Sequence, residues 1–184
     1  MKKIVAYTRT AIALHWLMAL LVFVTFPVGV VAHEMVLSPD KLRLLSYHKW
    51  LGVTLFILVL VRLAWRAGHK PAPLPDSLPA WQRSASQFVH VMLYVLLFAI
   101  PLSGWLMSSA KGFQTVYLGV LPLPDLLGKD KVLGDALAVL HQSLNITLLV
   151  LVAAHVAAAL KHHFIDRDGV LARMLPFLER SFSK

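Results

Sequence analysis

The length of 184 residues fits a single domain over residues 1–184. The composition indicates an integral membrane protein, because 58% of the residues are hydrophobic, only 15% are charged, and the mean hydropathy is +0.70. The absence of cysteine excludes disulfides, cysteine-bound zinc and iron–sulfur clusters. A formal net charge of +9 does not indicate a nucleic-acid-binding protein, because the basic residues flank apolar segments and form no stripe interleaved with aromatic residues.

The first predicted membrane span covers residues 10–32. It contains His15, one to two turns after its start, and Pro27. Because the apolar run is longer than the hydrophobic core of a signal peptide and includes these two residues, we interpret it as a retained span rather than a cleaved leader.

A second span is predicted over residues 41–67, and Ser38 followed by Pro39 indicates the start of its helix, with the serine as N-cap. His48 and Gly52 lie on one face of this helix, because residues four apart share a face. The glycine leaves space beside His48 for a flat and bulky group.

The third span is predicted over residues 81–109, after a proline-rich linker that cannot be helical throughout. His90 lies near the start of this span, and Pro101 is expected to kink it. The small residues Ser103 and Gly104 predict a close approach by another segment.

The fourth span, predicted over residues 136–164 after a loop rich in glycine and proline, places His141, His155 and His162 on one stripe. The fourteen residues from His141 to His155 correspond to about 21 Å of helix rise. One helix therefore presents histidines near both surfaces of a bilayer core about 30 Å thick. Ionisable side chains inside a membrane are energetically expensive and face the bundle interior, so they indicate a function.

The lysine and arginine residues indicate how the spans are oriented. Twelve of the eighteen lie in or next to the N-terminal segment, the linker between the second and third spans and the C-terminal tail. Cytoplasmic segments carry an excess of these residues, so both termini are predicted to be cytoplasmic. The fold class that follows is an all-α, multi-pass, four-helix transmembrane bundle.

With this orientation the histidines fall at two depths. His48 and His141 lie toward the outer side, on the second and fourth spans. The histidines toward the inner side, on the first, third and fourth spans, are His15, His90, His155 and His162. Histidines from different helices at two matching depths are what a bundle with two b-type haems needs, since imidazoles hold haem iron axially. Spacing alone leaves His90 as a rival inner ligand.

The sequence resembles the bacterial cytochrome b561 family over nearly its whole length. The segments that carry the resemblance are ALHWL (13–17), YHKWLG (47–52), VRLAWR (61–66), HVMLYVLLFAIPLSGW (90–105) and LHQSLNITLLVLVAAHVAAALKHHF (140–164). The last of these is specific, whereas any single histidine-containing span would be a weak signal. The resemblance implies a protein of the bacterial inner membrane that binds two haems b.

The resemblance also implies which histidines bind the haem iron. The outer haem would be held by His48 and His141, and the inner haem by His15 and His155. Arg62 lies at the inner end of the second span and is a candidate partner for haem propionates, because arginine pairs with carboxylates bidentately. The alternative is that Arg62 only anchors the span at the membrane surface.

The resemblance further places His90 and His162 near a ubiquinone site on the inner side. Histidine suits this site because it can give up a proton near neutral pH. One activity in the family is superoxide oxidation, in which electrons pass from superoxide through the outer and inner haems to ubiquinone. A positive outer surface would attract the anion, and the candidate residues, unless they are ordinary solvated charges, are Lys41, Arg43, Lys49 and Lys111.

Two other functions remain open at this point. The chain could be a cytochrome b subunit that relays electrons between the quinone pool and a separate oxidoreductase or hydrogenase, with a periplasmic donor other than superoxide. It could instead be a metal-ion transporter whose histidines bind zinc, although the spans lack carboxylates. The sequence favours neither a monomer nor a homo-oligomer.

Overall fold

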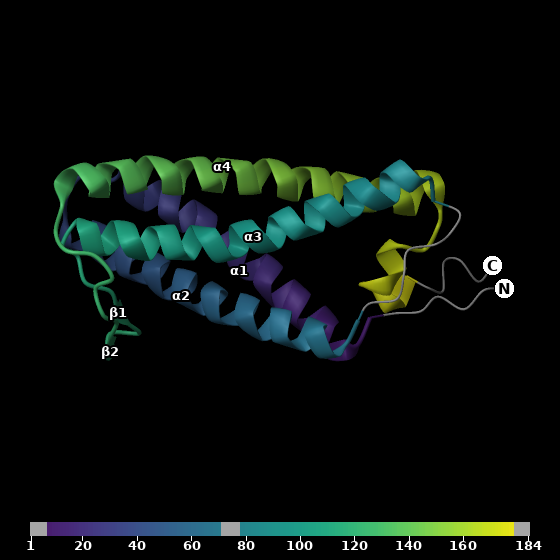
Figure 1. The fold of residues 1–184 in the computed structure, drawn as a ribbon, viewed down its shortest axis with the longest axis horizontal. Helices are drawn as coiled ribbons and strands as arrows, with labels where there is room; N and C mark the ends of the chain where they lie inside the picture. Colours follow the sequence, from purple (N-terminus) through teal and green to yellow (C-terminus); the bar gives the residue numbers. More distant parts are fainter. Residues whose placement is uncertain (1–6, 71–77, 179–184) are drawn as a thin grey trace.

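The computed structural model describes residues 7–70 and 78–178 (Figure 1). Within this part of the chain, four helices are long and apolar enough to cross a membrane: α1 (Arg9–Glu34), α2 (Pro39–Gly68), α3 (Ala80–Ala110) and α4 (Lys131–Lys161). The shorter elements are a β-hairpin of β1 (Val116–Tyr117) and β2 (Leu121–Pro122), a π-helical turn η1 (His162–Asp166) and a 3-10 turn η2 (Leu171–Arg173). The predicted all-α class and the four predicted spans are confirmed.

The four long helices form two helix pairs. The first pair is α1 packed on α2, the second pair is α3 packed on α4, and α2 also contacts α3 (Figure 1). Both ends of the described chain lie at one end of the bundle, where the backbone N–H of Tyr7 donates to the carbonyl of Arg173 at 3.2 Å. We call this the inner end, because its charges predict that it faces the cytoplasm, and the opposite one the outer end.

Local capping explains where α2 and α4 begin. As predicted, Ser38 is the N-cap of α2, and its Oγ accepts a hydrogen bond from the backbone N–H of Lys41 at 3.2 Å. The helix of the fourth span begins at Lys131, five residues before the predicted residue 136, because Asp130 caps this start by accepting from the N–H of Leu133 at 3.0 Å. The regular α-helix ends at Lys161, before the predicted residue 164, because the π-helical turn begins at His162.

The connection between α3 and α4 contains a β-hairpin that the sequence did not predict. Two contacts hold this part of the connection to α2: the indole N–H of Trp50 donates to the carbonyl of Val116 at 2.7 Å, and the hydroxyl of Tyr117 bonds that of Thr54 at 2.9 Å. The β-hairpin therefore lies against the outer end of the bundle (Figure 1).

Two clusters of buried side chains join the helices in the middle of the bundle. The first consists of Met18, Leu55 and Val59, and the second of Leu96, Ile100 and Leu148. Along α4, the cluster residue Leu148 lies midway between His141 and His155. An apolar layer therefore separates the two levels of histidines, while most other large apolar side chains are exposed and suited to lipid contact.

Candidate functional site

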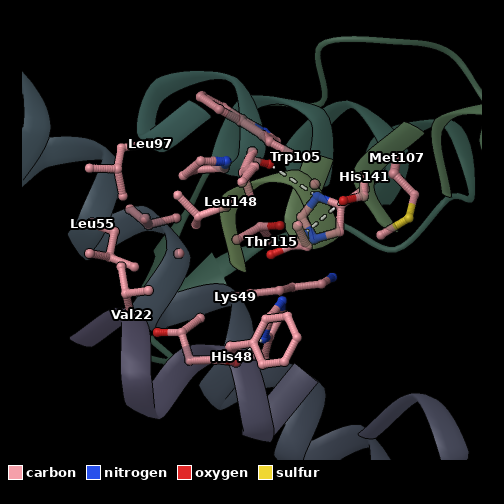
Figure 2. Close-up of a pocket in the computed structure, with 18 of the residues that line it drawn as sticks. Val22, His48, Lys49, Leu55, Leu97, Trp105, Met107, Thr115, His141 and Leu148 are labelled. Atoms are coloured by element: carbon pink, nitrogen blue, oxygen red, sulfur yellow. Dashed lines mark hydrogen bonds between the residues drawn. The ribbon is translucent and has the colours of Figure 1, made fainter. Parts of the chain in front are cut away.

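The outer end of the bundle contains a pocket between the helices with two histidines on its wall. His48 of α2 and His141 of α4 have ring centroids 6.2 Å apart and ring planes at 86° to each other. Figure 2 shows both rings and the side chain of Lys49 around the pocket. The pocket is open on one side, and apart from the two histidines and Lys49 its lining is mostly apolar, with residues from all four long helices.

Each outer histidine is held by hydrogen bonds to the preceding helix of its pair. Nδ1 of His48 lies 3.1 Å from the carbonyl oxygen of Thr25, and Nδ1 of His141 lies 3.1 Å from that of Ile100. Nδ1 of His141 also lies 3.0 Å from Oγ of Ser103. A carbonyl oxygen can only accept, so Nδ1 carries the proton in both rings. Nε2 of each ring is therefore left with a lone pair for a metal ion.

The inner level brings together histidines from three helices. The rings of His15 in α1 and His155 in α4 have centroids 6.2 Å apart and planes at 74°. His90 of α3 lies closer to His155, with centroids 5.3 Å apart and planes at 69°. The structure thus brings the three candidate ligands of the inner haem close together, and the rings of His15 and His90 both lie next to that of His155.

Arg62 lies beside this inner cluster, close enough for its charge to act on His15, His90 and His155. Its Nε donates to the hydroxyl of Tyr94 at 2.9 Å, and its guanidinium carbon lies 5.7 Å from the centre of the tyrosine ring. A second cation, Arg66, lies 5.6 Å from the same ring centre. Sequence reasoning singled out Arg62 but missed Tyr94, which fixes the direction of the guanidinium.

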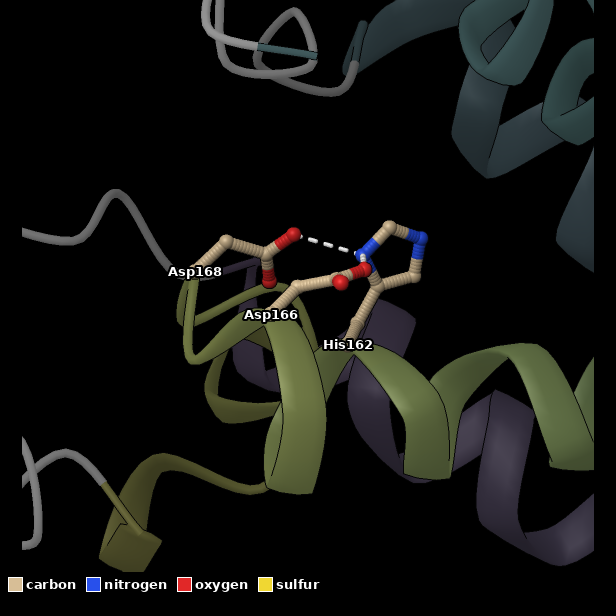
Figure 3. Close-up of side chains that lie close together, drawn as sticks. All are labelled: His162, Asp166 and Asp168. Carbon is tan, nitrogen blue, oxygen red and sulfur yellow. Dashed lines mark hydrogen bonds and ion pairs between the residues drawn. The ribbon is translucent and has the colours of Figure 1, made fainter.

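The structure places His162 in a network with two acidic residues that the sequence analysis did not identify. Nδ1 of His162 lies 2.5 Å from a carboxylate oxygen of Asp168 and 3.3 Å from one of Asp166 (Figure 3). Asp166 is also paired with the ammonium group of Lys161 at 2.6 Å. Asp168 reaches His162 because the chain reverses at Arg167, which has a left-handed backbone with φ of 51°.

The four basic residues expected to attract an anion have different surroundings. Lys49 lines the outer pocket next to His48 and donates to the carbonyl of Phe113 at 3.0 Å. Lys111 is paired with Asp135 at 3.1 Å. Of the other two, Lys41 donates to backbone carbonyls before α2, at 2.6 and 3.4 Å, and Arg43 is exposed.

Comparison with known proteins identifies the family. Residues 6–177 match the family described as prokaryotic cytochrome b561. The chain belongs to this family. Among cytochrome b561 relatives, it is 35% identical to cytochrome b561 homolog 2 of Escherichia coli K12 over 92% of this chain and 90% of the relative. It is 28% identical to cytochrome b561 homolog 1 of the same organism, over 92% and 97% of the two chains.

A third cytochrome b561 relative has a more specific name. The chain is 24% identical to the probable superoxide oxidase CybB of Yersinia pestis, over 92% of this chain and 96% of the relative. Cytochromes b561 bind haem b and transfer electrons in membranes. The chain is therefore a multi-pass membrane electron-transfer protein, and no reason remains to consider a metal-ion transporter.

The histidine geometry fits haem b. With a metal–nitrogen bond of about 2.0 Å on each side, two imidazoles that hold one iron have ring centroids roughly 6 Å apart. His48 and His141 meet this requirement at 6.2 Å, and their Nδ1 hydrogen bonds leave Nε2 for the iron. His15 and His155 have the same separation of 6.2 Å, whereas His90 and His155 are nearer at 5.3 Å.

Proposed function

We propose that this cytochrome b561 binds two haems b and carries electrons from superoxide at the outer end to ubiquinone at the inner end. His48 and His141 would hold the outer haem, and His15 and His155 the inner haem. The observation that supports this assignment best is the separation of 6.2 Å in both pairs, at two levels of one bundle. When bound, each haem supplies an iron that exchanges single electrons.

The protein's own residues would hold and orient the groups around this electron path. The carbonyls of Thr25 and Ile100 orient the outer imidazoles. Arg62 would pair with a propionate of the inner haem, and its hydrogen bond to Tyr94 at 2.9 Å supports this role by fixing the direction of the guanidinium. The apolar layer between the two levels keeps water out of the middle of the bundle.

Superoxide is proposed as the donor because of the Yersinia relative and the position of Lys49. Two superoxide anions would each give up one electron and become dioxygen, with no proton transfer at the outer end. Lys49 lines the outer pocket beside His48, so its positive charge would attract the anion to the site where the electron leaves. We therefore narrow the expected set of steering residues to Lys49.

Lys49→Gln is expected to slow superoxide oxidation several-fold at low ionic strength, because attraction of an anion by a single cation is screened by salt. The rate is measured by stopped-flow absorbance of the haem bands at increasing salt concentration. Lys49→Arg is the matched control, since it keeps the charge and should keep the rate. A Lys49→Gln rate equal to that of the unmodified protein at all salt concentrations would contradict the steering role.

Ubiquinone would take up two electrons and two protons at the inner end to become ubiquinol. His90 and His162 are the proposed proton donors to its oxygens. The contact between Asp168 and Nδ1 of His162 supports this, because it fixes the ring while Nε2 faces away from the carboxylate (Figure 3). Asp168 thus becomes a positioning residue for His162.

His162→Ala is expected to keep the full haem content and to slow ubiquinone reduction about tenfold or more, the usual scale for loss of a proton donor. Asp168→Asn should slow it less, because the amide retains a hydrogen bond to the ring. The measurement is the steady-state rate of quinone reduction per haem. Normal quinone kinetics in His162→Ala would remove this residue from the site.

A second candidate function is compatible with family membership alone, because the names of the two relatives from Escherichia coli specify no donor. In this case the chain would relay electrons between the quinone pool and a separate oxidoreductase. Stopped-flow mixing of the purified chain with superoxide distinguishes the two functions. Rapid reduction of its haem supports superoxide oxidation, whereas reduction by ubiquinol alone supports the relay.

A further inference from the structure

We propose that Gly29 and Gly104 are positioning residues that allow the two outer histidine rings to lie directly against a helix backbone and so fix the planes of these rings. Gly29 belongs to α1 and serves His48, and Gly104 belongs to α3 and serves His141. The inference deepens the proposed function, because it rests on ligation of the outer haem by these two histidines.

We use the word seat for a glycine backbone against which a histidine ring packs, and the first seat is Gly29 in α1. A Cβ atom on Gly29 would lie 2.6 Å from Cε1 and 2.9 Å from Nδ1 of His48. Real Cβ atoms essentially never make contacts this short, so any larger residue must displace the ring. The ring cannot move freely, because its Nδ1 is hydrogen-bonded to Thr25 in the same helix.

The second seat repeats this arrangement on α3. A Cβ atom on Gly104 would lie 3.0 Å from Cε1 and 3.3 Å from Nδ1 of His141. This ring is also fixed, by hydrogen bonds to the carbonyl of Ile100 and the hydroxyl of Ser103. The close approach that Ser103 and Gly104 predicted in the sequence is thus made by a histidine ring.

Helix geometry explains why both seats need glycine. The acceptor of His48 is the carbonyl of Thr25, four residues before Gly29, and the acceptor of His141 is the carbonyl of Ile100, four residues before Gly104. In an α-helix the carbonyl of residue i points toward the N–H of residue i+4. A ring that donates to this carbonyl from the side must therefore pass over residue i+4, where a Cβ would block it.

Among the described residues, no other helical glycine lies against a histidine ring; a Cβ on Gly134 in α4 would lie 2.8 Å from Cγ of Lys111, which is part of a flexible side chain. A Cβ on Gly52 or Gly68 would meet nothing within 4 Å. The two seats also occupy equivalent places in the two helix pairs: α1 holds the outer histidine of α2, and α3 holds the outer histidine of α4. The same device in two unrelated stretches of sequence argues that it serves the histidines and not general helix packing.

The seats have consequences for haem chemistry that go beyond stability. The hydrogen bond from Nδ1–H to a carbonyl makes an imidazole a stronger donor to iron and so influences the reduction potential. The angle between two axial imidazole planes, 86° for His48 and His141, affects the electron paramagnetic resonance spectrum of ferric haem. A methyl group at either seat should change both quantities for the outer haem alone.

The test compares Gly29→Ala and Gly104→Ala with Gly68→Ala, the matched control at the inner end of α2, where an added Cβ meets nothing. Each full-length protein is purified in detergent, and its haem content, ferric electron paramagnetic resonance spectrum and redox titration are recorded. We expect both seat variants to shift or lose the signal of one haem while the other is unchanged, and Gly68→Ala to match the unmodified protein.

Unchanged spectra and potentials in both seat variants would overturn the inference, as would loss of both haems in both variants, since a seat predicts a selective effect. The looser contact at Gly104 makes Gly104→Ala the milder substitution, and it decides the question if Gly29→Ala does not accumulate. His48→Ala is measured in parallel. If that variant keeps both haems, the proposed ligation has failed, whereas a selective loss there with normal seat variants refutes the seats alone.

Discussion

Replacing His48 or His141 with alanine is expected to lower the haem content from two per chain to one. Each ring supplies one of two axial nitrogens, at a centroid separation of 6.2 Å that suits a single iron. Loss of either ring should release the outer haem, while the inner pair is separated from it by the apolar layer. Haem and protein are quantified in the purified variants, and the remaining haem should show the spectrum of the inner site.

His33→Ala is the control for this experiment, because His33 is exposed near the outer end of α1. It should retain the haem content of the unmodified protein. Unchanged content in both His48→Ala and His141→Ala would refute the assignment of the outer ligands. Loss of all haem in each would instead indicate that the two sites do not form independently.

Replacing His15 or His155 with alanine is expected to remove the inner haem, whereas His90→Ala should keep both haems and slow ubiquinone reduction. The reason is geometric: His15 and His155 have the same centroid separation as the outer pair, while His90 lies too near His155 to share an iron with it. Haem content separates the two kinds of variant, and the rate of quinone reduction shows the effect of His90.

The opposite pattern would reassign the inner ligands. If His90→Ala lost a haem and His15→Ala retained both, the inner pair would be His90 and His155. If His90→Ala had normal haem content and normal quinone kinetics, His90 would have no role at the proposed quinone site. Each variant therefore tests a different part of the proposal.

Much of the architecture could be predicted because membrane-spanning helices have a strong local signal. Four apolar runs of sufficient length predicted four helices, and Ser38 before Pro39 predicted the start of α2. The helical period placed His141 and His155 on one face of α4, and the structure brings each of them to a histidine from another helix. Those partners depend on how helices pack, which spacing along one helix does not determine.

The remainder of the site depends on backbone groups and on short-range turns. Nothing in the residue types of Thr25 and Ile100 indicates that their carbonyls hold histidine rings. Gly29 follows Pro27 closely, as Gly104 follows Pro101, and this similarity is the one signal that could have been noticed. Asp168 was missed because its contact with His162 depends on a left-handed residue between them.

The pairing of the helices gives the cofactors a role in assembly. Each proposed ligand pair takes one histidine from the first helix pair and one from the second, namely His48 with His141 and His15 with His155. A bound iron would therefore act as a cross-link between two halves of the protein whose other contacts are mainly those of α2 with α3. Because a ligand that binds only the assembled form stabilises it, the abundance of this protein in the cell should follow the supply of porphyrin.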